Sequence, residues 1–143
     1  NHFTIKKGAN YYGLIFGTSH TLGMEKFQKV CWSVDRSAGE SNCNTQEDFE
    51  KGTLFYEITE PNKIHKVKEC LKKEIVNDQI TDNIQGLKRA LKLRCEPKVF
   101  TEVIKELEKE NKIERIGSKS YTSVNIHRIK ANGKDYYSIK KRI

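Results

Sequence analysis

Several features that define common protein classes are scarce in this chain. It has two prolines, one methionine and one tryptophan among 143 residues, and its four cysteines form no C-x-x-C pair. Without such a pair we expect no structural zinc site. The sequence contains neither G-x-x-x-x-G-K nor G-x-G-x-x-G, so no glycine-rich phosphate cradle is indicated. We therefore expect neither a metal nor a cofactor in this chain.

Long apolar runs are also missing. No stretch approaches the roughly 18 apolar residues that a membrane span needs. The chain opens with Asn-His-Phe and soon reaches Lys6 and Lys7, which is unlike a secretory signal. We therefore expect a reducing, cytoplasmic environment without disulfides. Because the chain does not begin with Met, we expect it to be part of a longer protein.

Positive charge is concentrated towards the C-terminus. The formal net charge is +8. Residues 1–61 hold 6 Lys and Arg against 8 Asp and Glu, residues 62–116 hold 14 against 10, and residues 117–143 hold 7 against 1. An anion-binding surface is therefore expected in the last segment and not in the acidic first one.

Residues 1–61 predict a strand–helix–loop–strand unit. Tyr11–Thr18 is short, apolar and aromatic, which indicates a buried strand. A helix should follow as far as Val34, because apolar residues recur at positions 27, 30, 31 and 34. The polar, acidic stretch 35–51 predicts a loop, and Thr53–Thr59 predicts a second strand. Trp32 either packs under that loop or marks a surface for a partner.

Residues 62–143 predict a winged helix-turn-helix. Apolar positions spaced by three and four indicate helices that begin near Asn62, Asp82 and Pro97. A strand over Lys112–Ile116 should follow. The fold class is thus α+β, with a strand–helix–strand unit followed by a winged helix-turn-helix.

A basic β-hairpin is expected at the end of the chain. Ser123–Lys130 and Asp135–Lys141 should pair around Asn132-Gly133, a sequence typical of hairpin turns. Arg128 and Lys130 are two residues apart and would project from one face of a strand. Tyr136 and Tyr137 add rings that can stack on bases or pack inward. This hairpin is the best candidate for a polyanion-binding surface.

The third helix of this region is a second candidate. Recognition helices place their N-terminal residues against base edges. The alternative is a solvated face, with pairs such as Glu102 with Lys105, Glu106 with Lys109, and Glu108 with Lys112. Together, helix and hairpin give these candidate nucleic-acid-binding residues: Lys98, Thr101, Lys105, Lys119, Arg128, Lys130, Lys134, Lys140 and Lys141.

Catalysis is not indicated by any residue pattern. Ser19 and His20 follow the first strand, where α/β enzymes place ligands. Sequence neighbours rarely have the geometry of a nucleophile and its base, and no carboxylate is placed to orient the imidazole. Helix capping by Ser19 or Thr21 is the simpler interpretation. We assign no catalytic residue.

Two blocks resemble a known family, the three-Cys-motif partner proteins. The blocks are Tyr11–Phe27 (YYGLIFGTSHTLGMEKF) and Cys31–Asp35 (CWSVD). In that family the stretch typically reads as an aromatic strand, S-x-H-P-L-G, a helix and W-K-[IV]-D. Thr21 stands where Pro is usual, and Ser33 where Lys is usual. A later leucine- and glutamate-rich run, Leu107–Ile113, also fits the resemblance.

The resemblance implies a particular organisation. Such proteins join a methyltransferase-like domain to a C-terminal winged helix and are encoded beside a cysteine-motif partner, often in phage or mobile elements. The motif that binds the methyl donor is absent here, so no catalytic residue is carried over. Residues 1–61 would be the tail of an upstream methyltransferase-like domain, and residues 62–143 its winged helix.

Nucleic-acid binding, with DNA or RNA, is therefore the expected function. The basic hairpin would position a substrate for the upstream domain. The alternative is a protein-interaction module that docks a partner protein through the third helix and the acidic loop 40–50.

Overall fold

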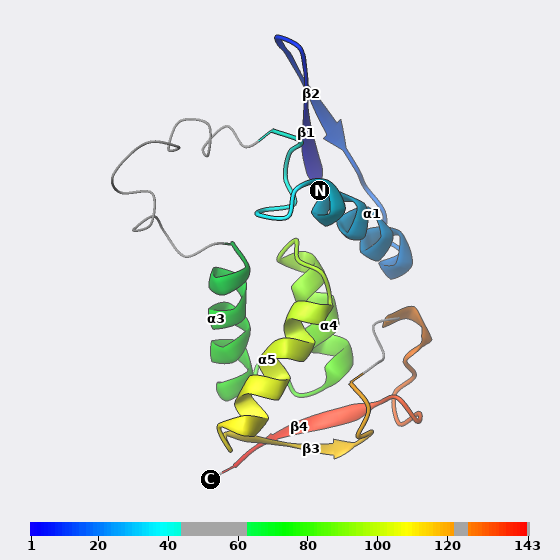
Figure 1. Cartoon of the computed structure of the whole chain (residues 1–143). Coiled ribbons are helices and arrows are strands. Elements are labelled where there is room, and N and C mark those ends of the chain that lie inside the picture. The colour runs from blue at the N-terminus through cyan, green and yellow to red at the C-terminus, as the bar shows by residue number, and fades with distance from the viewer. Residues whose placement is uncertain (44–62, 122–125, 143) are drawn as a thin grey trace, which may run out of the picture.

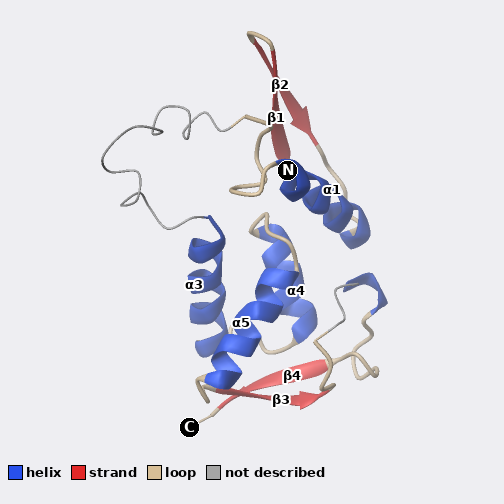
Figure 2. Ribbon diagram, viewed as in Figure 1, coloured by secondary structure: helices blue, strands red, loops and turns tan. Residues whose placement is uncertain are grey.

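The computed structural model describes residues 1–43, 63–121 and 126–142, and the fold is α+β (Figures 1 and 2). An N-terminal β-hairpin is followed by helices and a C-terminal two-stranded sheet. In chain order the described elements are β1 (His2–Lys7), β2 (Asn10–Ile15), α1 (Thr21–Val34), α3 (Lys63–Val76), α4 (Asn83–Lys92), α5 (Lys98–Lys109), β3 (Ile113–Gly117), the 3₁₀ turn η2 (Ile126–Arg128) and β4 (Tyr137–Lys141).

The N-terminal hairpin differs from the expected buried strand. β2 is a strand, but all six of its residues are exposed, so the prediction of burial was wrong. Its only strand partner among the described residues is β1, which sequence reasoning missed because Lys6 and Lys7 suggested a polar opening. Gly8 turns the chain between the strands with a φ of +62°, which favours glycine. The strand expected at Thr53–Thr59 lies outside the described residues.

Helix α1 is confirmed in its extent but not in its buried face. The residues that it buries are Gln28, Cys31 and Trp32, whereas Val30 and Val34 are exposed. The apolar stripe expected at 27, 30, 31 and 34 therefore points only partly inward. The N-cap of α1 is His20, whose Nδ1 accepts a hydrogen bond from the N–H of Leu22, so the cap is neither Ser19 nor Thr21.

Trp32 connects residues 1–43, here called the N-terminal unit, to the helices α3, α4 and α5. Its side chain is buried, and its Nε1 donates a hydrogen bond to the carbonyl of Arg94 at 3.0 Å. Gly39, in the loop after α1, comes so close that an added Cβ would lie 2.8 Å from Nε1. Trp32 therefore packs against the described part of the loop after α1, which is one of the two expected alternatives.

Helices α3, α4 and α5 form the core, as their apolar periodicity predicted. The residues that they bury include Leu71, Leu87, Ala90, Phe100, Val103, Ile104 and Leu107. At the start of α4 Asp82 accepts the hydrogen bond from the N–H of Gln85. The side chain of Gln85 accepts from the N–H of Thr81, so the capping box is only half formed. Gly86 lets the Phe100 ring lie directly on the α4 backbone, since a Cβ there would be 2.0 Å from Cε2.

The C-terminal sheet pairs strands other than those expected. β4 pairs antiparallel with β3, in the register Ile113 with Lys141 through Gly117 with Tyr137. An isolated bridge joins Asp82 to Ser138, and the N–H of Ile139 donates to the carbonyl of Thr81. The strand expected over Ser123–Lys130 was wrong for its described part, because Ile126–Arg128 is a 3₁₀ turn.

Residues 118–136 are here called the β3–β4 loop, and its described residues from 126 onwards fold back against the helices. Ile126 and Ile129 of this loop are buried, and η2 contacts both α1 and α4. Asn83 of α4 donates a hydrogen bond from Nδ2 to the carbonyl of Asp135 at 2.8 Å. The expected Asn132-Gly133 turn does form, with a φ of +62° at Asn132. It lies within this loop and does not connect two paired strands.

Candidate nucleic-acid interface

The candidates on α5 fall within its first eight residues, and the helix runs from its N-terminus towards the β3–β4 sheet (Figure 1). Lys98 is exposed in the first turn, and its Nζ pairs with Glu96 at 2.5 Å. Thr101 is half-buried. Lys105 is exposed, and its Nζ lies 4.8 Å from the centre of the Tyr121 ring. Of the two lysines, Lys98 forms an ion pair with a carboxylate, whereas Lys105 forms none with the described residues.

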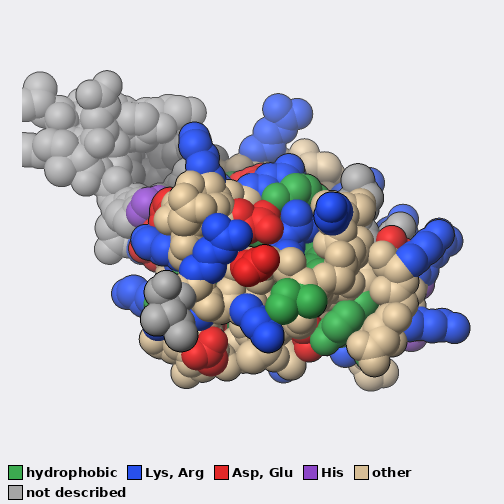
Figure 3. Space-filling model, turned by 90° about the horizontal axis from the view of Figure 1, so that it is seen from below, with side chains coloured by type: hydrophobic (Ala, Val, Ile, Leu, Met, Phe, Trp, Pro, Cys, Tyr) green, Lys and Arg blue, Asp and Glu red, His purple; other side chains and the backbone are tan. Residues whose placement is uncertain are grey.

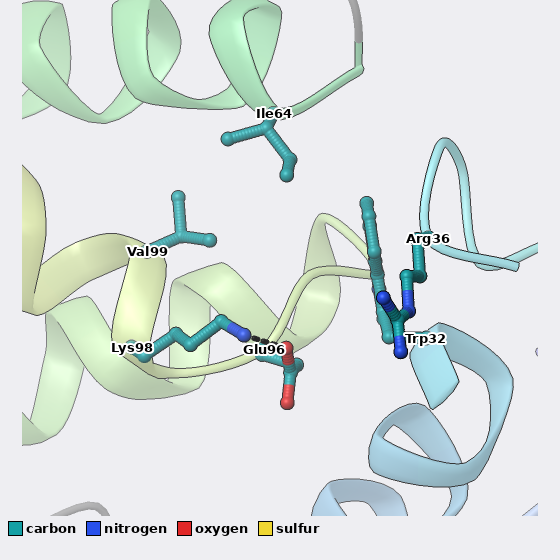
Figure 4. A pocket seen from close by; sticks show the side chains of 6 residues that line it. All are labelled: Trp32, Arg36, Ile64, Glu96, Lys98 and Val99. Carbon is teal, nitrogen blue, oxygen red and sulfur yellow. Dashed lines mark ion pairs between the residues drawn. The ribbon is translucent and has the colours of Figure 1, made fainter. Parts of the chain in front are cut away.

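A shallow pocket of about 260 Å³ borders Lys98 (Figure 4). Figure 4 shows the Trp32 ring and Arg36 on one side of it, Lys98 reaching towards Glu96 on another, and Ile64 above. The N-terminal unit therefore occupies space beside the first turn of α5. A groove of nucleic acid could approach this turn only on the side away from Trp32.

The glutamates of α5 bind cations on α3 and β3, not on α5 as expected. Lys68 of α3 pairs with Glu102 at 2.8 Å and with Glu106 at 3.0 Å, and Lys72 also pairs with Glu106. Hydrogen bonds from Lys68 and Lys72 lower the pKa of Glu106. The acidic half of α5 is thus largely neutralised by the protein itself. Because these glutamates are paired, they repel phosphates less strongly, and they are also less suited to docking a basic partner protein.

Arg115 of β3 is a residue that sequence reasoning missed. Its Nε donates to Glu108 of α5 at 2.6 Å, and its guanidinium lies 3.8 Å from the centre of the Tyr121 ring and 5.0 Å from that of Tyr137. The hydroxyl of Tyr121 also donates to Glu108, and this bond raises the pKa of Tyr121. The only available signal was strand alternation, which puts Arg115 on the same face as the apolar Ile113. This placement favours an Arg115 side chain that points towards the helices.

The two adjacent tyrosines are not equally available for stacking. Tyr137 is buried, and burial raises its pKa to about 12. Tyr136 is partly buried and packs against the core. The inward-packing alternative is therefore confirmed for Tyr137, and at most Tyr136 can meet a base.

The remaining candidates are exposed cations of the β3–β4 loop and β4. Within the described residues none of them forms an ion pair with a carboxylate; they are Lys119, Arg128, Lys130, Lys134, Lys140 and Lys141. Because η2 is not a strand, Arg128 and Lys130 do not share a strand face as expected. Lys140 lies across from Glu114 in the sheet. Lys140 and Lys141 project to opposite faces by strand alternation.

Charges of both signs lie on this end of the molecule. Figure 3 shows Lys and Arg side chains spread around the face below the helices, with Asp and Glu side chains and apolar side chains between them. The cations are therefore accessible, but they do not form one uninterrupted patch.

His20 lies in a separate groove between the start of α1 and the end of α4. The residues lining it are Asn1, Thr18, Ser19, His20, Thr21, Met24, Lys88, Leu91 and Lys92. No carboxylate is among these described residues, so nothing orients the imidazole as a base. The ring nitrogen Nδ1 is used to cap the helix. The geometry gives His20 a role in capping α1.

The described ranges contain neither a metal-binding cluster nor a membrane-spanning helix. There, no three His, Cys, Asp or Glu side chains gather closely enough to hold a metal ion. No helix of residues 1–43 or 63–142, as far as these are described, has the length and apolar character to span a bilayer. The four cysteines are free, and burial raises the pKa of Cys95 to about 11.

Comparisons with protein families, with curated proteins and with solved structures find no match to this chain. The resemblance to three-Cys-motif partner proteins therefore depends on the quoted sequence blocks alone.

Proposed function

We propose that this chain binds DNA or RNA with little sequence preference, through the cations of the β3–β4 loop and β4. The observation that carries the proposal is the set of six exposed Lys and Arg side chains without an ion-pair partner among the described residues. Such side chains can exchange condensed counterions of a polyanion for phosphate contacts, which is the main source of sequence-independent affinity.

We infer a winged helix from the order of the elements, and this inference supports the same use. The order is α3, Asp82 with its bridge to Ser138, α4, α5, β3, a loop and β4. Winged helices commonly place the helix that precedes the sheet, here α5, near the nucleic acid, with the loop between the strands beside it. Lys105 and Thr101 on α5 would then add secondary contacts. Lys98 contributes less, because Glu96 neutralises it.

The cellular setting is part of the same proposal. We place the chain in the cytoplasm, where its four free thiols are kept reduced. If the family resemblance holds, the bound nucleic acid is positioned for a methyltransferase-like domain upstream of residue 1. Docking of a partner protein is the alternative function, but the pairing of Glu102 and Glu106 with α3 does not favour α5 as its surface.

Fluorescence anisotropy with labelled duplex and single strands tests the proposal. Six phosphate contacts on duplex DNA would give a slope of about −5 in log K against log salt. Binding should therefore weaken by roughly a thousandfold between about 50 mM and 200 mM salt. Absence of binding at the lower salt concentration removes the proposal. Binding to a neighbouring gene product that survives high salt would favour the alternative.

A further inference from the structure

Among the described residues, the backbone groups on the outer edge of β2 have no hydrogen-bond partner. On β1, Thr4 uses both its N–H and its C=O outside the hairpin, with Asn42 and Glu40. Its cross-strand partner Gly13 therefore points its own N–H and C=O away from β1. The same alternation turns those of Tyr11 and Ile15 outward. Since Glu40–Asn42 cover the free edge of β1, β2 is the open edge of this small sheet (Figure 1).

This edge is apolar and uncharged. Tyr11, Tyr12, Leu14 and Ile15 are 55%, 52%, 47% and 85% exposed. No charged residue occurs from Asn10 to His20, although the chain as a whole carries a net charge of +8. Proteins usually protect an exposed edge strand with Lys, Pro, a bulge or a covering segment, and β2 has none of these among the described residues. An edge of this kind is suited to pairing with another strand.

We propose that two copies of this chain pair antiparallel along β2, with the two-fold axis at Gly13. In this register Tyr11 lies opposite Ile15 of the second copy, and Tyr12 opposite Leu14. The outward N–H and C=O groups of Tyr11, Gly13 and Ile15 are then all satisfied. The two hairpins become one four-stranded sheet with strand order β1, β2, β2, β1.

The self-complementarity of β2 selects a second copy as the occupant. Registers centred on Tyr12 or Leu14 leave Tyr11 or Ile15 opposite a glycine, whereas the register at Gly13 matches each aromatic ring with an aliphatic side chain. Gly13 has no neighbouring atom within 4 Å of a Cβ position, so the sheet face above it is open and the Tyr11 and Ile15 side chains have room to pack there. Lys6 and Lys7 are on β1, and the Nζ of Lys6 lies 5.6 Å from the centre of the Tyr11 ring, so its charge reaches one face of the sheet while the backbone edge of β2 carries none.

Sedimentation equilibrium of the whole chain across a wide concentration range tests the dimer. We expect a mass of twice 16.6 kDa at high concentration. Ile15→Lys puts one positive charge from each copy into the contact. It should therefore raise the dissociation constant of the dimer about tenfold or more. Ile15 is 85% exposed, so the monomer should fold unchanged, as circular dichroism can verify. Val30→Lys is the control, since Val30 is 61% exposed but lies on α1.

Oxidative cross-linking tests the register. Hydrogen-bonded antiparallel pairs hold their Cα atoms about 5.5 Å apart, within the range of a disulfide. Gly13→Cys should therefore give a covalent dimer much faster than Gly17→Cys, which lies off the axis. A monomeric wild-type chain overturns the proposal, as does a dimer that Val30→Lys dissociates and Ile15→Lys does not. Equal cross-linking of the two cysteine variants overturns the axis at Gly13.

Discussion

The described residues form two antiparallel two-stranded sheets, which differ in how far the helices bury them. In β3–β4, Ile113, Tyr137 and Ile139 are buried against the helices, whereas β1–β2 buries only Phe3. β4 alternates apolar and polar residues, which suits one covered face. β2 has apolar residues on both faces, which no single layer of helices can cover. The residue pattern of a strand thus indicates how many of its faces are apolar and favour burial. It does not indicate whether other residues of the same chain cover those faces.

The largest effect should come from truncating the same residue type in the two sheets. Ile139→Ala, in β4, removes a buried side chain and should lower the free energy of unfolding by about 2–5 kcal/mol. Ile15→Ala, in β2, removes an 85% exposed one and should change it by less than about 0.5 kcal/mol in the monomer. Urea unfolding at low protein concentration measures both. Similar losses for the two variants would contradict the comparison.

Gly86→Ala should be the next largest change. The new Cβ would meet the Phe100 ring, which is fully buried and has no room to shift. Overpacking typically costs about 1–3 kcal/mol, more than the roughly 1 kcal/mol that Ala gains over Gly in a helix. Gly17→Ala, where nothing lies within 4 Å, is the control. A more stable Gly86→Ala protein would show that the helix packing is looser than described.

Substitution of Asp35 measures how much its carboxylate stabilises the loop after α1. Burial would raise its pKa, but hydrogen bonds from the Glu40 N–H, the Ser37 side chain and nearby backbone outweigh burial and lower the pKa to about 2. Its stabilisation is thus full above about pH 4 and is lost as the pH falls through about 2. We expect Asp35→Asn to cost about 2 kcal/mol at pH 7 and progressively less below about pH 4.

Urea unfolding at several pH values measures this dependence. Asp78→Asn is the matched control, because Asp78 is exposed and has a φ of +56°, which Asn tolerates. A cost for Asp35→Asn that does not change with pH would show that the carboxylate charge is not its source.

Trp32→Phe should give the smallest of these effects. Phe keeps most of the buried surface but cannot donate to the carbonyl of Arg94. We expect a loss of about 1 kcal/mol, the usual net value of such a hydrogen bond. Tyr12→Phe, which removes an exposed hydroxyl on β2, should cost almost nothing in comparison. If the two losses are equal, this bond does not connect the N-terminal unit to the helices.

Elements were predicted correctly from the sequence where the spacing of apolar residues fits one kind of secondary structure only. The spacing of Leu87 and Leu91, and of Phe100, Val103 and Leu107, fits only a helix, and α4 and α5 were predicted for that reason. Ile126 and Ile129 are three residues apart, a spacing that fits a helical turn and would put them on opposite faces of a strand, and the expected strand was wrong there. Short segments of this kind are decided by what they pack against, here α1 and α4.

The site was harder to predict than the fold. Exposed lysines could be found from charge counts, but their partners could not. Arg115 and Glu108 are on different elements, as are Lys68 and Glu106, and local spacing carries no signal for such pairs. The sequence favoured pairs within α5 because neighbours on one helix are the only ones that spacing reveals.

The salt dependence of nucleic-acid binding tests the central claim most directly. The triple variant Arg128→Ala, Lys130→Ala and Lys134→Ala removes three charges from the β3–β4 loop. Its control, Lys6→Ala, Lys7→Ala and Lys26→Ala, removes three exposed charges from the N-terminal unit, so both variants retain +5 of the original +8. The loop variant should reduce the slope of log K against log salt by about 3, and the control should leave it unchanged. Equal slopes for the two variants would contradict the claim that this loop binds the phosphates.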